Sequence, residues 1–164
     1  KTLKKFLKNK NKSLSILDMG SGSGIQAQTS ISLGFKKTLA VDKNPESIKI
    51  LTEKKINAVR SNLFSKIKIK KFNLIIFNPP YLPEDKREPE DSKLAKTGGK
   101  KGDEILKKFL SQAKDHLNKN GKILVVISNL TGKPEELFKD YSWKLLEKEE
   151  IFMETLSVYI LNQS

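Results

Sequence analysis

The sequence predicts a doubly wound α/β fold, in which helices cover both faces of a mostly parallel sheet. Apolar segments of strand length alternate with amphipathic segments of helix length along the chain, which is the pattern of βαβ units. A glycine-rich turn follows the first predicted strand and opens the first predicted helix. The apolar run at residues 74–77 has the composition of a buried parallel strand and stops at two prolines, which cannot continue a sheet.

The elements follow one another in order. We expect strands at residues 14–19, 38–41, 57–60 and 73–77, with helices at 26–33 and 46–55. Asn44 can cap the second helix, and Pro45 stands in the first-turn position that proline favours. Residues 105–117 have the apolar spacing of an amphipathic helix. We expect Gly121 to end that unit, a strand at 122–128, a short helix at 135–140, and two closing strands at 143–152 and 154–161.

Length and composition limit the number of domains and the types of functional site that the chain can have. The 164 residues are enough for one domain with a substantial core, so we expect a single domain over residues 1–164. The sequence contains no cysteine and one histidine, His116, which we expect to be partly exposed. A disulfide scaffold, a cysteine-ligated metal and a Ser-His-Asp hydrolase are therefore not supported, and we expect no metal site. No apolar stretch reaches the ~20 residues that span a bilayer, so we expect a cytoplasmic protein without membrane contact.

The net charge of +13 favours an acidic partner such as RNA or the ribosome. Nearly all cations are lysines, and Arg60 and Arg87 are the only arginines. Proteins that read bases rely on arginine for two-pronged contacts, so sequence-specific recognition is not indicated. A lysine bias from an A/T-rich genome, with solvated lysines at residues 1–5 and 66–71, is the alternative.

The glycine-rich turn carries an acidic residue in front of it. Asp18 precedes a Gly-x-Gly-x-Gly pattern at Gly20, Gly22 and Gly24, and Ile25 stands where a dinucleotide fingerprint would have its last glycine. A carboxylate is a poor neighbour for a pyrophosphate and a good one for a cation, so a sulfonium amino acid with a free ammonium group fits better. Asp42 ends the second strand at the position where an acidic side chain hydrogen-bonds ribose hydroxyls. A flexible turn beside a helix N-terminus is the alternative reading.

Asn78-Pro79-Pro80-Tyr81 follows the buried run at residues 74–77. In an open parallel sheet, ligands bind at the carboxyl ends of the strands. The motif places an amide, proline-fixed carbonyls and an aromatic ring there. An ordinary strand-terminating turn is the alternative. The charged segment at 82–101 is long for a compact domain, and we expect it to be functional or mobile.

Together these motifs resemble a class I S-adenosylmethionine-dependent methyltransferase. More narrowly, they resemble the HemK-like glutamine methyltransferases of the archaeal and eukaryotic type, which modify the Gly-Gly-Gln loop of class I release factors. The similarity covers nearly the whole chain, and the Gly-Gly-x-x-Gly-x-Glu pattern at residues 98–104 favours the protein-glutamine branch. The resemblance implies a seven-stranded Rossmann-like sheet with an antiparallel C-terminal strand. It implies catalytic groups at Asn78, Pro79, Pro80 and Tyr81, and S-adenosyl-L-methionine contacts at Asp18, Gly20, Ser21, Gly22, Gly24, Asp42, Lys43, Asn62, Leu63 and Asn78.

Two departures from the family pattern matter. The acidic residue that contacts the adenine amino group is replaced by Asn62, whose amide oxygen accepts the same bond without charge. Relatives also have an upstream segment that covers the cofactor, and about a dozen residues precede the first predicted strand here. The resemblance further implies a small zinc-binding activator subunit.

Three functions remain open on sequence grounds. The first is methyl transfer to a release-factor glutamine, with the Asn78 oxygen and the Pro79 carbonyl holding the amide. The second is adenine N6-methylation of RNA or DNA, which the same clamp serves. The third is a non-catalytic, cofactor-binding partner protein.

Overall fold

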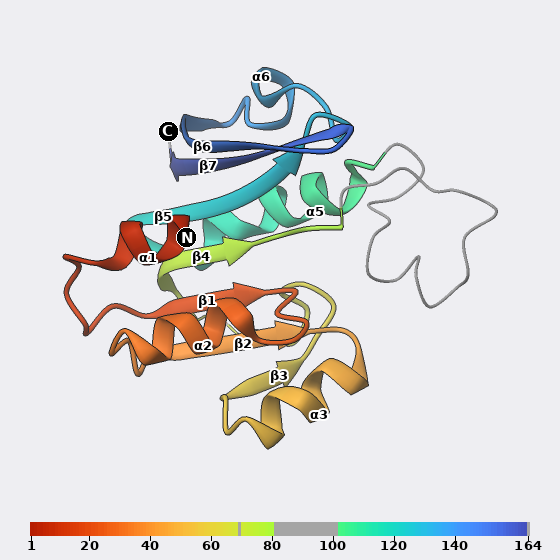
Figure 1. The fold of residues 1–164 in the computed structure, drawn as a ribbon. Helices are drawn as coiled ribbons and strands as arrows, with labels where there is room; N and C mark the ends of the chain where they lie inside the picture. The colour runs from red at the N-terminus through yellow and green to blue at the C-terminus, as the bar shows by residue number, and fades with distance from the viewer. Residues whose placement is uncertain (69, 81–101, 164) are drawn as a thin grey trace.

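The computed structural model describes residues 1–68, 70–80 and 102–163, and shows a seven-stranded sheet with helices on both faces (Figure 1). The strand order is β3-β2-β1-β4-β5-β7-β6. Strand β7 pairs antiparallel with both β5 and β6, and all other pairings are parallel. The strands are β1 (Ile16–Met19), β2 (Thr38–Asp42), β3 (Ala58–Arg60), β4 (Phe72–Phe77), β5 (Leu117–Ser128), β6 (Tyr141–Ile151) and β7 (Glu154–Gln163). The predicted doubly wound sheet with one antiparallel C-terminal strand is confirmed.

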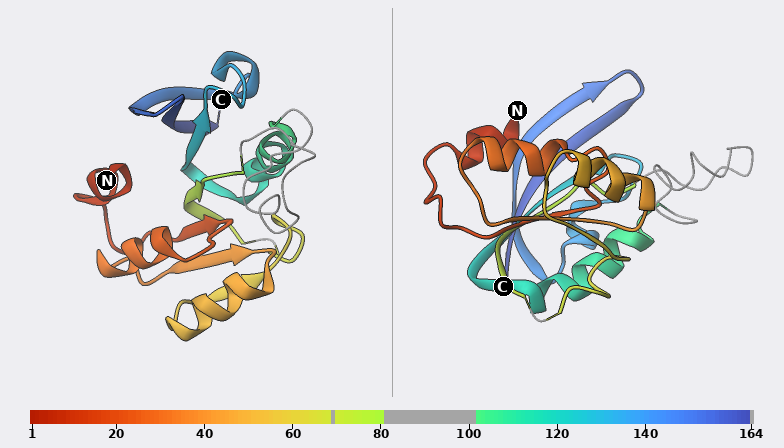
Figure 2. Two further views of the ribbon diagram at one scale, coloured as in Figure 1. Left: turned by 45° about the vertical axis from the view of Figure 1, so that its right-hand side comes forward. Right: turned by 90° about the horizontal axis from the view of Figure 1, so that it is seen from below.

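The helices lie between the strands, as the alternation predicts. They are α1 (Thr2–Leu7), α2 (Ile25–Ser32), α3 (Pro45–Glu53), α5 (Glu104–Ala113), the 3₁₀ turn η1 (Lys114–His116) and α6 (Pro134–Leu137). Helices α1, α2 and α3 lie over one face of the sheet and α5 lies over the other (Figure 2). The predicted cap of α3 is confirmed, because the Asn44 side chain accepts a 2.9 Å hydrogen bond from the Glu46 amide and Pro45 opens the helix.

The core follows the two-residue period of the strands. On β1, Leu17 and Met19 pack into the larger apolar cluster with α5, and Ile16 packs into the cluster under α1. Phe77 at the end of β4 tilts against Phe109 of α5, with ring centroids 4.3 Å apart. This packing fixes the carboxyl end of β4 against α5.

The prediction that Gly121 ends a helical unit is wrong. The helix ends at Ala113, and β5 already begins at Leu117 and continues through Gly121. The pairing of β5 with β4 shifts register beside this glycine, and an added Cβ would stand 2.8 Å from the Asn118 oxygen and 2.9 Å from the Phe72 oxygen. Glycine is needed here because two backbones approach each other at an irregularity within the strand.

Helix α1 was not predicted, because the segment is short and rich in lysine and has few apolar residues. Leu3 and Leu7 stand four residues apart and are buried in the cluster that includes Phe35. The lysines Lys4 and Lys5 are exposed, as expected of a solvated face. No helix in the described part of the chain is long and apolar enough to cross a membrane.

Candidate functional site

A cavity of about 380 Å³ lies at the carboxyl ends of β1, β2 and β4. This is within the size range of small-molecule sites, roughly 300–1,000 Å³. Two turns distant in sequence border it together, the glycine turn through Gly20 and Gly22 and the proline turn through Asn78 and Pro80. The other lining residues are Met19, Val41, Asp42, Lys43, Asn44, Ser47, Ser61, Asn62, Leu63, Phe77, Ile105 and Lys108.

The glycine turn needs its glycines for two different reasons. Gly20, Gly22 and Gly24 all have left-handed φ angles, of 63°, 51° and 82°, which residues with a Cβ adopt only at a cost. A Cβ on Gly24 would stand 2.6 Å from Leu51 Cδ2, so this glycine lets α2 pack closely on α3. A Cβ on Gly22 would meet nothing within 4 Å. Gly22 therefore leaves the cavity open to a ligand that approaches the backbone.

Asp18 supports the glycine turn through hydrogen bonds. Its side chain is 2% exposed, and Oδ2 accepts hydrogen bonds from Ser21 Oγ at 2.5 Å and from the Ala27 amide at 2.9 Å. Burial raises the pKa of Asp18 to about 6, the nearby charge of Asp42 adds to the shift, and the two hydrogen bonds oppose it. Asp18 does not line the cavity. Its direct role is to fix the turn and the start of α2.

Asp42 joins two of the loops around the cavity. Its Oδ2 accepts from the Gly22 amide at 2.8 Å and its Oδ1 accepts from the Asn44 amide at 2.9 Å. Each carboxylate oxygen keeps further acceptor capacity, and the residue is half-buried and lines the cavity. A pair of hydroxyl donors, as on a ribose, matches this acceptor.

The loop after β3 forms the next wall. Leu63 has a left-handed φ of 50°, a conformation that costs on the order of 1–3 kcal/mol for a residue with a side chain. Buried Ser61 supports it, because its Oγ donates to the Leu63 oxygen at 2.8 Å and its amide donates to the Asp42 oxygen at 2.9 Å. Asn62, between them, is exposed and lines the cavity.

The proline turn presents one polar side chain to the cavity. Asn78 is exposed at the end of β4, Pro79 behind it is buried, and Pro80 is half-buried. Asn78 and Pro80 line the cavity, and Pro79 does not. Tyr81 and residues 98–101 of the glycine-containing segment lie outside the described residues, so their predicted roles stay predictions.

The predicted cofactor residues divide into two sets. Gly20, Gly22, Asp42, Lys43, Asn62, Leu63 and Asn78 line the cavity, whereas Asp18, Ser21 and Gly24 support the glycine turn from outside it. Among the described residues, no group of three or more acidic or histidine side chains is placed to hold a metal ion. A larger cavity of about 670 Å³ between α5 and α6 contains none of the predicted residues.

Sequence reasoning missed eight of the lining residues. Four follow directly from the predicted strands and loops, namely Met19, Val41, Ser61 and Phe77, and the other four are Asn44, Ser47, Ile105 and Lys108. Ser47 lies three residues after Asn44, and Lys108 three residues after Ile105, so each pair shares one helix face. Helical spacing counted from the carboxyl rim of the sheet would have found them. Lys108 adds an exposed cation to the lining of the cavity that Asp42 also lines.

Known proteins are similar to this chain in sequence. The sequence profile of the "Methyltransferase small domain" family matches residues 1–152. A relative from Methanocaldococcus jannaschii named "Putative protein N5-glutamine methyltransferase" is 41% identical over 114 residues, which are 65% of this chain and 57% of the relative. A release factor glutamine methyltransferase of Aquifex aeolicus is 32% identical over 128 residues, 63% of this chain and 46% of the relative. The chain thus spans about half the length of these curated relatives.

Solved structures agree with the fold. The E. cuniculi Mtq2–Trm112 complex, described as responsible for methylation of the translation termination factor eRF1, matches with a TM-score of 0.74 at 19% identity, over 99% of this chain and 93% of that one. A methyltransferase from Bacteroides fragilis, solved with S-adenosyl-L-homocysteine, matches with a TM-score of 0.68 at 16% identity, over 100% of this chain and 77% of that one. At these identities the likeness shows the fold.

Proposed function

Because this chain belongs to the methyltransferase small domain family, we propose that it moves a methyl group from S-adenosyl-L-methionine to a planar amide nitrogen. The acceptor we infer is the glutamine of the Gly-Gly-Gln loop of a class I release factor. One observation carries the proposal: the glycine turn and Asn78 border a single cavity. The names of the two curated relatives support glutamine as the acceptor.

The residues around the cavity fit the cofactor. Gly22 leaves space beside the backbone, Asp42 offers carboxylate acceptors to ribose hydroxyls, and Asn62 is exposed at the rim. When bound, the cofactor supplies an electrophilic methyl group on a sulfonium centre. S-adenosyl-L-homocysteine is then the product, and it leaves from the same residues.

Asn78 and the prolines would act on the acceptor. A glutamine amide nitrogen is a weak nucleophile, because its lone pair is delocalised into the carbonyl group. The Asn78 side-chain oxygen and the Pro79 carbonyl would accept hydrogen bonds from its two N–H groups, which orients the nitrogen and favours positive charge developing on it. The proline rings keep these acceptors still. No strong base is required, since the methylated nitrogen becomes acidic and loses its proton late.

The experiment separates the acceptor classes. The protein is incubated with S-adenosylmethionine carrying a labelled methyl group and with either a class I release factor or RNA. We expect label on the release factor, and none on a release factor whose Gly-Gly-Gln glutamine is alanine. Label on adenine in RNA would replace the glutamine proposal with the adenine one. Cofactor binding without transfer to either acceptor would indicate a non-catalytic partner protein.

We also infer a small protein partner. The structurally similar Mtq2 was solved with Trm112. Among the residues that the structure describes, no strand pairs with the outer edges of β3 and β6, and such edges are sites where another chain can add. The partner is proposed to be a small zinc-binding activator. Coexpression with such a subunit should raise both soluble yield and methyl transfer. Equal yield and turnover without it would count against the partner.

A further inference from the structure

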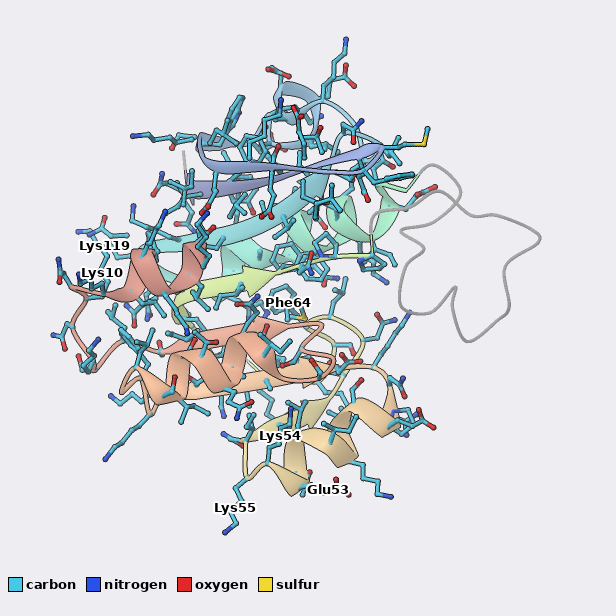
Figure 3. The ribbon with its side chains drawn as sticks, in the orientation of Figure 1. Lys10, Glu53, Lys54, Lys55, Phe64 and Lys119 are labelled. Atoms are coloured by element: carbon cyan, nitrogen blue, oxygen red, sulfur yellow. The ribbon has the colours of Figure 1, made fainter. Side chains whose placement is uncertain are left out.

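The amino end of the sheet, opposite the candidate site, carries a concentration of lysines. Segments that enter β1, β2, β4 and β5 bring exposed lysines to this rim. The eight that define the lysine rim are Lys10, Lys12, Lys36, Lys37, Lys68, Lys70, Lys71 and Lys119. Lys10 and Lys119, from segments far apart in sequence, project at the same end of the molecule (Figure 3).

Contacts between neighbouring segments join them into one surface. The Lys12 ammonium lies 4.3 Å from the centre of the Phe35 ring, next to Lys36. Ser15 Oγ donates to the Lys71 oxygen at 3.5 Å, and His116 Nδ1 lies 3.0 Å from the Lys70 oxygen. The rim therefore continues from the start of β2 to the start of β5 without a break.

Acidic residues are rare along this rim. Asp115 is the only carboxylate in the segments 8–15, 36–37, 66–71 and 114–120. Within the described part of the chain, the recorded ion pairs join Lys1 to Glu147 and Lys107 to Asp103, and neither involves a rim lysine. A general lysine bias would enrich lysine on every surface, but it does not explain why the carboxylates are kept away from this one.

We propose that the lysine rim binds the phosphate backbone of RNA by charge and without reading its sequence. The rim crosses four neighbouring strands, about 14 Å at ~4.8 Å between strands. Over that length double-stranded DNA carries roughly eight phosphate charges on its two strands, at one per ~1.7 Å of helix axis, and a surface on one side of a duplex faces part of them. None of the exposed large apolar side chains of the described residues belongs to the rim segments, so the surface lacks the inserting groups of a membrane-bound face. The choice of RNA rests on the proposed function in translation, which the name of the Aquifex aeolicus release factor glutamine methyltransferase supports.

Bound RNA would leave the methyl-transfer site free. The rim lies at the amino ends of the parallel strands, and the candidate site lies at their carboxyl ends. A release factor can then approach one end of the sheet while RNA occupies the other. The two interactions should be separable by substitution.

Two charge-matched variants test the proposal. The rim variant replaces Lys36, Lys37, Lys70 and Lys119 with glutamine. The control variant replaces four exposed lysines outside the rim with glutamine, namely Lys49, Lys133, Lys144 and Lys148. Binding of the whole protein to a short RNA duplex is measured over a series of salt concentrations, with thermal unfolding and cofactor binding confirming that each variant is folded.

For the original protein we expect log K to fall linearly with log salt concentration, because phosphate contacts release counterions. The rim variant should lose about three to four units of slope, at ~0.9 per phosphate contact, and the control variant less than about one. Equal losses of slope in both variants would overturn the proposal that the lysine rim binds RNA, because net charge alone would then explain the binding. Binding to anionic phospholipid vesicles and not to RNA would overturn the RNA assignment. Methyl transfer to isolated release factor should be the same in both variants, so failure here is distinct from failure of the proposed function.

Discussion

The carboxyl end and the amino end of the sheet differ in which charged side chains they carry and in whether those side chains are hydrogen-bonded to the backbone. At the carboxyl end, the Asp42 carboxylate accepts hydrogen bonds from two backbone amides, and Lys43 and Lys108 line the same cavity. At the amino end, exposed lysines project without a partnering carboxylate among the described residues. The difference indicates a rigid site for a small ligand at one end and an adaptable, salt-sensitive surface at the other.

The largest effect should follow from Asn78→Ala. Turnover should fall by about 100-fold or more, the usual range for losing one donor or acceptor that acts on the reacting group. Cofactor affinity should change by less than about threefold, because Asp42 and the glycine turn are intact. Single-turnover methyl transfer and cofactor titration measure the two quantities. Turnover within a factor of three of the original protein would remove Asn78 from the mechanism.

Two glycine substitutions separate packing from ligand access. Gly24→Ala and Gly22→Ala both put a Cβ on a left-handed residue, which costs about 1–2 kcal/mol. Only Gly24→Ala also adds a contact at 2.6 Å to Leu51, and overpacking adds about 1–3 kcal/mol. Urea unfolding should therefore show a larger stability loss for Gly24→Ala.

Cofactor titration should show the reverse order. Gly22→Ala fills the open space beside the backbone and should weaken cofactor binding more than its stability loss explains. Similar affinities in the two variants, with both folded, would show that Gly22 does not face the ligand.

The carboxyl end should also respond to pH through Asp18. Its pKa is about 6 in the folded protein, above the ordinary value of 3.8, so the folded state binds more protons between these values. Stability therefore falls as pH rises from about 4 to 6, by on the order of 3 kcal/mol if this group acts alone. Asp18→Asn should flatten the unfolding free energy over this range. An unchanged pH slope in the variant would show that another group is responsible.

The smallest effect should be the salt dependence of cofactor binding. Asp42 would be met by neutral ribose hydroxyls, and hydrogen bonds of that kind depend little on ionic strength. We expect less than a threefold change in cofactor affinity between low salt and a salt concentration several times higher. A steep dependence would mean that the two ends of the sheet do not differ as described.

Local sequence patterns predicted those parts of the fold whose causes are local. The Asn44 cap with Pro45, the glycine turn after β1 and the proline stop after β4 were all read correctly, because each depends on neighbouring residues. Gly121 was wrongly predicted to end a helical unit. Glycine is needed at this position because the backbone of β4 approaches it, which the sequence around Gly121 does not reveal. Helix α1 was missed because Leu3 and Leu7 gain their burial from distant Phe35.

The candidate site shows the same division. Motif spacing brought Gly22, Asp42 and Asn78 to one rim, but it could not tell a lining residue from a supporting one. Asp18 does not line the cavity; its Oδ2 accepts hydrogen bonds from Ser21 Oγ and from the Ala27 amide. Lys108 was not predicted because it lies on α5, and the position of α5 beside the cavity depends on how Phe109 packs against Phe77.

A crystal structure of the protein with S-adenosyl-L-methionine tests the central claim most directly. We expect the ribose hydroxyls against Asp42, the adenine near Asn62, and the sulfonium methyl directed at the Asn78 side chain. A cofactor bound in the larger cavity between α5 and α6, or bound at the carboxyl rim with its methyl directed away from Asn78, would contradict the account.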